Sequence, residues 1–315
     1  MGVIPAFSND AVLAAVSPGE AIERTRRAFE RHALGEWEMP AKVYLDSPPH
    51  GDFRAMPARG DGLALLKWVT SFPANPQRGL PVVAGLVVLS DATSGEPLAI
   101  IDCRAVTWLR TGAAAAVSTL ALAPSQARTA GLIGCGVNGA WAARCLAASG
   151  YGPGVCSDRD AEAARTLADE LGWIAGPRDE AAAQDVVVTV TPGDEPVLHA
   201  SDLRPGQHFA VLGADAHGKA EVDPAAIERC SLFCDEWEQA AGGGELAGPV
   251  LRGAVGRDDV VELGVVLTGR APGRRADDEL TLFDSTGLAI QDLAIAQAVL
   301  EGWREGRVEA KEIEL

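Results

Sequence analysis

Three glycines stand between an apolar run and an alanine-rich segment in TAGLIGCGVNGAWAARCLAASG, residues 129–150. Gly134, Gly136 and Gly139 have the spacing G-x-G-x-x-G, in which glycine permits a tight turn and lets the backbone approach a pyrophosphate. The helix that follows such a loop offers free backbone N–H groups to an anion. The spacing therefore predicts a dinucleotide-binding loop, and the alternative is a tight turn without a ligand.

An acid follows this loop at the place where a dinucleotide's ribose is expected. Asp158 ends the next predicted strand, GVCSD. A carboxylate there accepts hydrogen bonds from the adenosine ribose hydroxyls and repels a 2′-phosphate, which favours NAD over NADP. Arg159 beside it could soften that preference.

Two cations lie where a protein core would not choose them. Lys67 interrupts LALLKWVTS, in which both sides of the predicted strand are otherwise apolar. Burial lowers the pKa of a lysine toward the range of acid–base catalysis, whereas an edge lysine would simply extend its amine to water. Arg110 lies on a predicted helix with no acid within one turn, which favours a ligand anion as its partner; the alternative is a solvated arginine.

Four further residues are candidates on weaker grounds. Lys42 and Arg54 flank the turn DSPPHGD, where two cations on neighbouring strands could hold a carboxylate, although such residues are more often surface charges. Asp215 follows HFAVLG near the predicted carboxyl end of a parallel strand, where open α/β sheets place their ligands. His217 is a candidate proton carrier, with a solvated loop histidine as the alternative.

The elements that must position these residues change in character along the chain. Ser17 to Gly35 is predicted to be a helix, because Ser17 and Glu20 form a capping box with Pro18 at the first helical position. Short apolar runs between Pro, Gly, Asp and Ser clusters over 39–103 indicate a mostly antiparallel sheet. A helix is expected over 105–123, followed by apolar runs alternating with helical segments, which indicates parallel βαβ units. The final LAIQDLAIAQAVLEGWREG predicts a strong amphipathic helix.

Composition excludes several classes of partner. The net charge of −17 argues against a nucleic-acid surface or an anionic membrane surface, so the expected partner is a small molecule or another protein. The six cysteines follow no C-x-x-C spacing, and Cys230 and Cys234 could hold a metal only with further ligands, so no metal is expected. No basic region precedes an apolar core at the start of the sequence, and the apolar runs are shorter than about 18 residues, which predicts a cytoplasmic protein.

Seven motifs occur in an order that resembles the ornithine cyclodeaminase/mu-crystallin family. They cover the chain from about Met39 to Ala296: MPAKVYLD, FRAMPA, LLKWVTSFPANPQRGLP, LRTGAA, IGCGVNGA, LGADAHGKAEVD and TLFDSTGLAIQD. The resemblance implies an α/β protein with a Rossmann-type doubly wound parallel sheet over 116–289. It further implies an α+β substrate-binding and dimerisation domain over 1–115, completed by 290–315, and a homodimer formed through these domains.

The resemblance also assigns roles to residues. The family's substrate-carboxylate lysine falls on Lys67, its helix arginine on Arg110 and its catalytic aspartate on Asp215. Cyclodeaminases and mu-crystallin usually carry arginine where this chain has Lys42, so the combination of Lys42, Arg54 and RTGAA is more similar to the archaeal-type alanine dehydrogenases. The residues expected at the cofactor are Arg110, Thr111, Gly134, Gly136, Val137, Asn138, Gly139, Asp158, Arg159, Thr191 and Ser285.

The function expected from these residues is hydride transfer at the α-carbon of an amino acid or its imine. We expect an NAD(H)-dependent oxidoreductase acting on a small L-amino acid, on its 2-oxo acid with ammonia, or on a cyclic imine. Lys42, Arg54, Lys67 and Arg110 would bind carboxylate and oxo groups, and Lys67 and Asp215 would move protons from a cleft between the domains.

Two other functions stay open. An ornithine or lysine cyclodeaminase would recycle NAD internally, with no net change in NADH. A non-catalytic mu-crystallin-like binding protein is the third possibility, against which the set of Lys67, Arg110 and Asp215 argues. The side chain of the substrate is beyond what the sequence predicts.

Overall fold

The computed structural model describes residues 2–193, 195–215 and 218–314. The chain forms two compact units, the first made of Met1–Arg110 with Leu288–Leu315 and the second of Thr111–Gly287. The first division lies inside helix α3 (Cys103–Leu122), and the second lies just before helix α11 (Ala289–Arg304). These divisions are a few residues earlier in the chain than the predicted boundaries after 115 and 289.

A mixed, mostly antiparallel sheet forms the first unit, as predicted. Its strand order is β15-β1-β6-β5-β4-β3-β2, and within it only the β1–β6 pair is parallel. β1 and β15 were not predicted, because β1 contains Pro5, which argues against a strand, and β15 is short and mostly charged. The strands are β1 (Val3–Phe7), β2 (Val43–Ser47), β3 (Gly51–Gly60), β4 (Leu63–Ser71), β5 (Val83–Asp91), β6 (Pro97–Asp102) and β15 (Lys311–Glu314).

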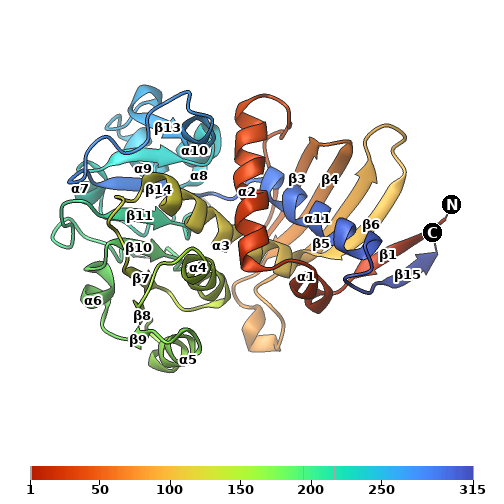
Figure 1. Ribbon diagram of the computed structural model, residues 1–315, viewed down its shortest axis with the longest axis horizontal. Coiled ribbons are helices and arrows are strands. Elements are labelled where there is room, and N and C mark those ends of the chain that lie inside the picture. Colours follow the sequence, from red (N-terminus) through yellow and green to blue (C-terminus); the bar gives the residue numbers. More distant parts are fainter. Residues whose placement is uncertain (1, 194, 216–217, 315) are drawn as a thin grey trace. The chain divides into compact units, whose positions relative to one another are not determined.

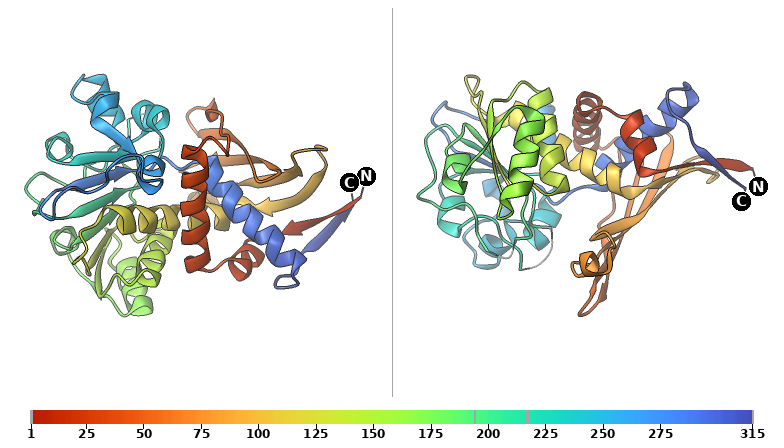
Figure 2. Two further views of the ribbon diagram at one scale, coloured as in Figure 1. Left: turned by 45° about the horizontal axis from the view of Figure 1, so that its top comes forward. Right: turned by 90° about the horizontal axis from the view of Figure 1, so that it is seen from below.

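Helices of the first unit lie over one face of this sheet (Figures 1 and 2). Helix α2 (Pro18–Ala33) begins as predicted, with the Ser17 hydroxyl accepting a hydrogen bond from the Glu20 N–H at 3.2 Å. The prediction that α11 is amphipathic is wrong, because its residues are buried almost throughout, Gln291 and Asp292 included. Helix α1 (Asn9–Ala15) and the short 3₁₀ segment η1 (Asn75–Arg78) complete the unit.

The other face of the sheet is apolar and exposed. Side chains alternate along β4, so that Leu65, Lys67 and Val69 are buried while Leu66 and Trp68 are 43% and 42% exposed. The strand registers place the exposed residues of neighbouring strands beside them, and the rings of Phe53 and Trp68 stack at 5.6 Å between centroids. We call this surface the outer face; its exposed large apolar residues are Val43, Leu45, Leu66, Trp68, Leu86 and Val88.

The second unit is a doubly wound parallel sheet, as predicted. Its strand order is β13-β12-β14-β11-β10-β7-β8-β9, every pair in it is parallel, and helices lie on both sides (Figure 1). The strands are β7 (Ala130–Ile133), β8 (Gly154–Ser157), β9 (Ile174–Ala175), β10 (Val186–Thr189), β11 (His208–Val211), β12 (Ser231–Cys234), β13 (Val260–Glu262) and β14 (Thr281–Asp284). The helices are α4 (Val137–Ala148), α5 (Ala161–Leu171), α6 (Arg178–Ala182), α7 (Pro224–Ile227), α8 (Trp237–Gly243), α9 (Ala247–Leu251) and α10 (Leu263–Leu267), with the 3₁₀ segment η2 (Arg257–Asp259).

Helix α3 is apolar enough and long enough to cross a membrane by composition alone. However, 78% of its most apolar window is buried inside the protein, as in the core helix of a soluble domain.

The second half of α3 contacts a histidine in the core of the parallel sheet. The imidazole of His208 lies 3.2 Å from the Ser118 hydroxyl through Nε2 and 3.0 Å from the Thr281 hydroxyl through Nδ1. Burial, and secondly the charge of Arg274, lower the pKa of His208 to about 3.

This histidine predicts a loss of stability in acid. The folded protein keeps His208 neutral to about pH 3, whereas the unfolded chain binds a proton there below its ordinary pKa of 6.5. The free energy of unfolding therefore loses on the order of 2 to 3 kcal/mol from this group between pH 7 and pH 4.5. Urea unfolding of wild type and His208→Gln at both pH values measures it. The difference between the two proteins should shrink in acid, and a difference that is constant with pH would contradict the prediction.

Candidate active site

The predicted lysine of β4 lies in a buried ion pair. Lys67 is 1% exposed, and its Nζ donates hydrogen bonds of 2.7 Å to Asp292 Oδ1 on α11 and 2.7 Å to Thr107 Oγ1 on α3. The reading of Lys67 as an edge lysine that reaches water is therefore wrong. Burial lowers the pKa of Lys67, the Asp292 carboxylate opposes that shift, and the Arg110 charge adds to it.

Arg110 completes this group, which we call the lysine cluster: Lys67, Thr107, Arg110 and Asp292. Arg110 Nε lies 3.7 Å from Asp292 Oδ1, so the acid that the sequence around Arg110 lacks comes from a distant helix. Arg110 Nε and Asp292 Oδ2 are buried and have no hydrogen-bond partner among the described residues. A buried polar atom without a partner is costly, so the cluster retains unused capacity to donate and accept hydrogen bonds.

Arg54 shares the covered face of the sheet with Lys67. In the β3–β4 register Arg54 stands opposite Val69, and Met56 opposite Lys67, so the two cations point to the same side. Arg54 is itself paired, since its Nε lies 2.6 Å from Asp52 Oδ1 and its Nη2 lies 3.2 Å from Asp52 Oδ2. Lys42 is half-buried and immediately precedes β2, the neighbour of β3.

The glycine loop of the second unit has the geometry that the G-x-G-x-x-G spacing requires. Gly134 has φ +102°, and a Cβ on Gly139 would lie 1.9 Å from the Gly134 carbonyl oxygen. A Cβ on Gly136, by contrast, would meet nothing within 4 Å. Gly136 is the N-cap of α4, so no side chain caps this helix, and Val137, Asn138 and Gly139 form its first turn. Gly134 and Gly139 are therefore required by the fold, whereas Gly136 leaves space in front of the N-terminus of α4.

Other predicted cofactor residues border the same edge of the parallel sheet. The Asp158 carboxylate accepts hydrogen bonds from Cys135 N at 2.6 Å and Asp160 N at 2.8 Å, so it holds the glycine loop. Asn138 Oδ1 and Thr191 Oγ1 are buried without a hydrogen-bond partner in the described part of the chain. These orphaned atoms and the open space at Gly136 fit a bound dinucleotide.

Asp215 and Ser285 follow two central strands of this sheet. Asp215 comes after β11 and pairs with Lys219, whose Nζ lies 2.7 Å from Asp215 Oδ1. Ser285 directly follows β14, and its hydroxyl lies 3.3 Å from Asp235 Oδ2. Arg159 is exposed beside Asp158, and Thr111 is buried in α3. His217 lies outside the described residues.

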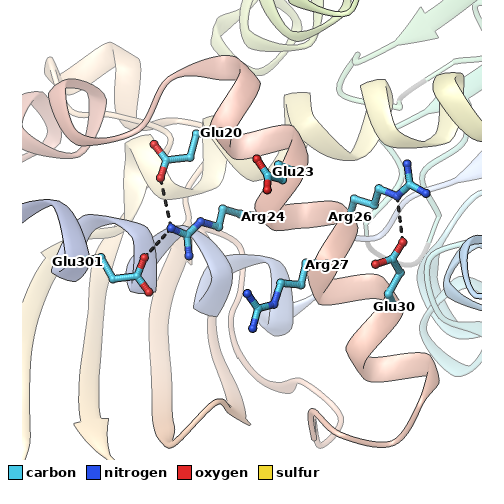
Figure 3. Close-up of a pocket in the computed structure, with 7 residues that line it drawn as sticks. All are labelled: Glu20, Glu23, Arg24, Arg26, Arg27, Glu30 and Glu301. Carbon is cyan, nitrogen blue, oxygen red and sulfur yellow. Dashed lines mark hydrogen bonds and ion pairs between the residues drawn. The ribbon is translucent and has the colours of Figure 1, made fainter.

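A surface hollow of the first unit is lined by none of these residues (Figure 3). Arg24 bridges Glu20 and Glu301 there at 3.4 and 2.5 Å, and Arg26 pairs with Glu30 at 2.9 Å. Its charged side chains neutralise one another, so it offers no site of a single charge. The lining residues are Glu20, Glu23, Arg24, Arg26, Arg27, Glu30 and Glu301.

Sequence reasoning missed the acids that hold the predicted cations. Asp292 interrupts the apolar run LAIQDLAIAQAVL as Lys67 interrupts its strand, and that signal could have identified it. Asp52 carried no such signal, because it lies beside a polar turn. Thr107 was concealed within a helix of good helix formers.

Residues 8–307 match the ornithine cyclodeaminase/mu-crystallin family. The chain belongs to this family. The predicted resemblance is confirmed, and so is the α/β fold class, since the family's solved structures match both units over their full length.

Three relatives are notably similar. The chain is 39% identical over 302 residues to the alanine dehydrogenase of Archaeoglobus fulgidus, and the match covers 94% of each chain. A solved archaeal alanine dehydrogenase dimer with bound NAD has a TM-score of 0.95 at 37% identity, covering 100% of both chains. The iminosuccinate reductase of Paracoccus denitrificans is 37% identical over 257 residues, 78% of each chain. Its complex with NAD⁺ has a TM-score of 0.91 at 30% identity and covers both chains completely.

The third relative is the Δ¹-pyrroline-2-carboxylate reductase of Thermococcus litoralis, whose structure was solved in complex with NADH and L-proline. It has a TM-score of 0.92 at 26% identity and covers 99% of this chain and 100% of its own.

The glycine loop yields a paired prediction. Gly136→Ala should keep the melting temperature, because its Cβ meets nothing, but weaken NADH binding by about tenfold or more, because it fills the space for the pyrophosphate. Gly139→Ala should lower the melting temperature by roughly 5 °C or more, because its Cβ collides with backbone at 1.9 Å. Thermal melting and NADH fluorescence titration distinguish the two. Unchanged NADH affinity in Gly136→Ala would contradict the placement of the pyrophosphate.

Proposed function

We propose that the protein is an NAD(H)-dependent oxidoreductase acting on the CH–NH₂ or C=N group of a small L-amino acid, of its 2-oxo acid plus ammonia, or of a cyclic imine. The observation that carries the proposal is the lysine cluster, in which a buried lysine and arginine share one carboxylate and leave polar atoms unused. A family relative named for each of these reaction types supports it: alanine dehydrogenase, iminosuccinate reductase and pyrroline-2-carboxylate reductase.

The second unit would hold the cofactor at its glycine loop. Backbone N–H groups of the first turn of α4 would bind the pyrophosphate over Gly136, and Asp158 would accept hydrogen bonds from the adenosine ribose, favouring NAD over NADP. Val137, Asn138, Thr191 and Ser285 are the further proposed contacts. Bound NAD(H) supplies the hydride chemistry, and the chain supplies orientation and proton transfer.

The first unit would hold the substrate. The guanidinium of Arg110 offers an unused Nε–H to a carboxylate, and Arg54 and Lys42 add positive charge. Burial lowers the pKa of Lys67, so the ammonium at its Nζ is an effective proton donor to an oxygen or nitrogen of the substrate. The neutral amine that results can take the proton back. The Asp292 carboxylate, which pairs with Lys67, favours the return of the lysine to its charged form.

Asp215 would move the second proton. We propose that its carboxylate accepts a proton from attacking ammonia during carbinolamine formation and returns it when water leaves. The ammonium of Lys219 lies 2.7 Å from Asp215 Oδ1 and helps to orient the carboxylate.

The function and its two residues can be tested together. Purified protein should oxidise NADH with one or more members of a panel containing pyruvate with ammonium and cyclic imines, read by absorbance. Lys67→Met and Asp215→Asn should each lower turnover on the order of 10²- to 10⁴-fold, because each removes a proton-transfer group. Lys311→Met, at an exposed strand, is the control.

Ornithine and lysine belong in the same panel. Their conversion to cyclic products without net NADH change would indicate a cyclodeaminase instead, and tight ligand binding without any turnover would indicate a binding protein. Near-normal turnover in either variant would overturn the role of that residue.

We further propose a cytoplasmic homodimer in which the outer face is covered by a second copy. Six large apolar side chains are exposed together on neighbouring strands of the outer face, which is typical of an interaction surface, and a two-fold axis would place the same apolar strands against each other. The archaeal alanine dehydrogenase relative is a dimer.

Light scattering at micromolar concentration tests this assembly. The wild type should have the mass of two chains. Trp68→Glu with Leu86→Glu should yield a monomer that stays folded, because both side chains point away from the core and charged groups at the centre of the face resist burial. A monomeric wild type would overturn the proposed dimer.

A further inference from the structure

A fully buried glutamate, Glu221, follows the proposed proton carrier Asp215 by six positions in the sequence. Glu221 is 0% exposed, and its carboxylate receives hydrogen bonds from three groups on two strand ends. Oε2 accepts from the Thr189 hydroxyl at 2.9 Å and from Gly213 N at 2.7 Å, and Oε1 accepts from Thr191 N at 2.5 Å. Thr189 ends β10 and Gly213 follows β11, so one carboxylate ties together the segments that continue from both strands.

The three donors explain why a carboxylate stands at this position. Each oxygen of an ionised carboxylate only accepts hydrogen bonds, which matches three N–H or O–H donors pointing at two oxygens. A glutamine would turn an NH₂ group toward at least one of these donors and leave that donor buried without an acceptor. Burial raises the pKa of Glu221, whereas the bonds from Thr191, Gly213 and Thr189 lower it.

Glu221 is itself firmly held. Its N–H donates to Glu245 Oε2 at 2.9 Å, and Val222 N donates to Glu245 Oε1 at 2.9 Å. Its carbonyl oxygen accepts from Val197 N at 2.7 Å and Leu198 N at 3.0 Å. The carboxylate of Glu221 therefore projects from a backbone that is fixed on both sides.

The residues that Glu221 holds adjoin the proposed active residues. Gly213 precedes Asp215 by two positions, and Lys219, which pairs with Asp215, precedes Glu221 by two positions. Thr191 is a proposed cofactor contact. Space around Gly213 is tight as well, since a Cβ there would lie 2.3 Å from the Thr191 carbonyl oxygen and 2.5 Å from Glu221 Cδ.

We propose that Glu221 is a positioning residue for Asp215: by binding Gly213 N and Thr191 N together, it fixes where the segment after β11 leaves the sheet. This inference rests on the proposed function only for the role of Asp215, and not for the structural link. Displacement of a catalytic group by about 1 Å can cost on the order of 10²-fold in rate, so loss of the link should appear in turnover.

Hydrogen exchange tests the link without any substrate or cofactor. In Glu221→Gln the Gly213 and Thr191 amides should exchange about tenfold or more faster than in the wild type. Asp185→Asn is the matched control, because Asp185 also accepts two backbone N–H bonds, from Arg128 at 2.8 Å and Thr129 at 3.0 Å, but lies directly before β10, at the end of that strand opposite to Thr191. It should leave both amides unchanged. Unchanged exchange at Gly213 and Thr191 in Glu221→Gln would overturn the proposal.

A double-mutant cycle tests the route of action. Glu221→Gln alone should lower kcat about 10- to 100-fold, whereas in an Asp215→Asn background it should cost less than about threefold, because the group that it positions is already gone. Costs that multiply in full would show that Glu221 acts on the fold and not through Asp215, and would overturn the proposal.

Thr189→Val is a second variant that weakens the same link. If Glu221→Gln does not fold, Thr189→Val removes one of the three donors and leaves the carboxylate in place. It should then raise exchange at Gly213 and lower kcat by about threefold, and no change in either would overturn the proposal. If the wild type turns over no member of the panel, the proposed function has failed, and exchange at Gly213 and Thr191 alone decides the positioning.

Discussion

The ion pair between Lys67 and Asp292 is the constraint on which the first unit depends. A lysine with 1% exposure survives in a core only if an acid meets it, and removal of one partner of a buried pair costs about 3 to 5 kcal/mol. The acid comes from α11, more than two hundred residues later in the sequence, so the chain must return to the first sheet after building the second unit. On α3, Thr107 contacts Lys67 and Arg110 contacts Asp292, so this helix is held against the same ion pair. The return of the chain to the first unit thus supplies the acid that satisfies this buried amine.

Buried carboxylates play the corresponding part in the second unit. Glu221 binds the ends of β10 and β11, and Asp235 accepts hydrogen bonds from Gly287 N at 2.7 Å and the Thr286 hydroxyl at 3.1 Å after β14. Asp158 does the same for the glycine loop at the end of β7. These acids gather at the carboxyl ends of parallel strands, where backbone N–H groups lack sheet partners and where such folds bind ligands. Part of the net charge of −17 therefore lies inside the protein as hydrogen-bond acceptors for loops.

Local patterns were sufficient to predict most of the elements and some of the site. Apolar runs predicted β2 to β6 and most of the parallel strands, but not β9, β13 and β14, and one charge in an apolar strand identified Lys67. What pairs with that charge was not predictable, because Asp292 is distant in sequence and the amphipathic reading of α11 assigned its polar residues to solvent. Glu221 was concealed by GKAEVD, whose polar composition resembles a solvated loop. The insertion of β14 between β11 and β12 likewise depends on long-range packing and leaves no local signal.

The return of the chain to the first sheet also sets the order in which the protein can mature on the ribosome. Lys67 and Arg110 are synthesised early, but Asp292 and the strand β15 that pairs with β1 come from the last part of the chain. The nascent first unit must therefore wait, with an unpaired lysine and an uncovered edge at β1, while the whole second unit is translated. Residues 111–287 hold all their own strands and can fold first, so the unit that begins the sequence is the last to be finished.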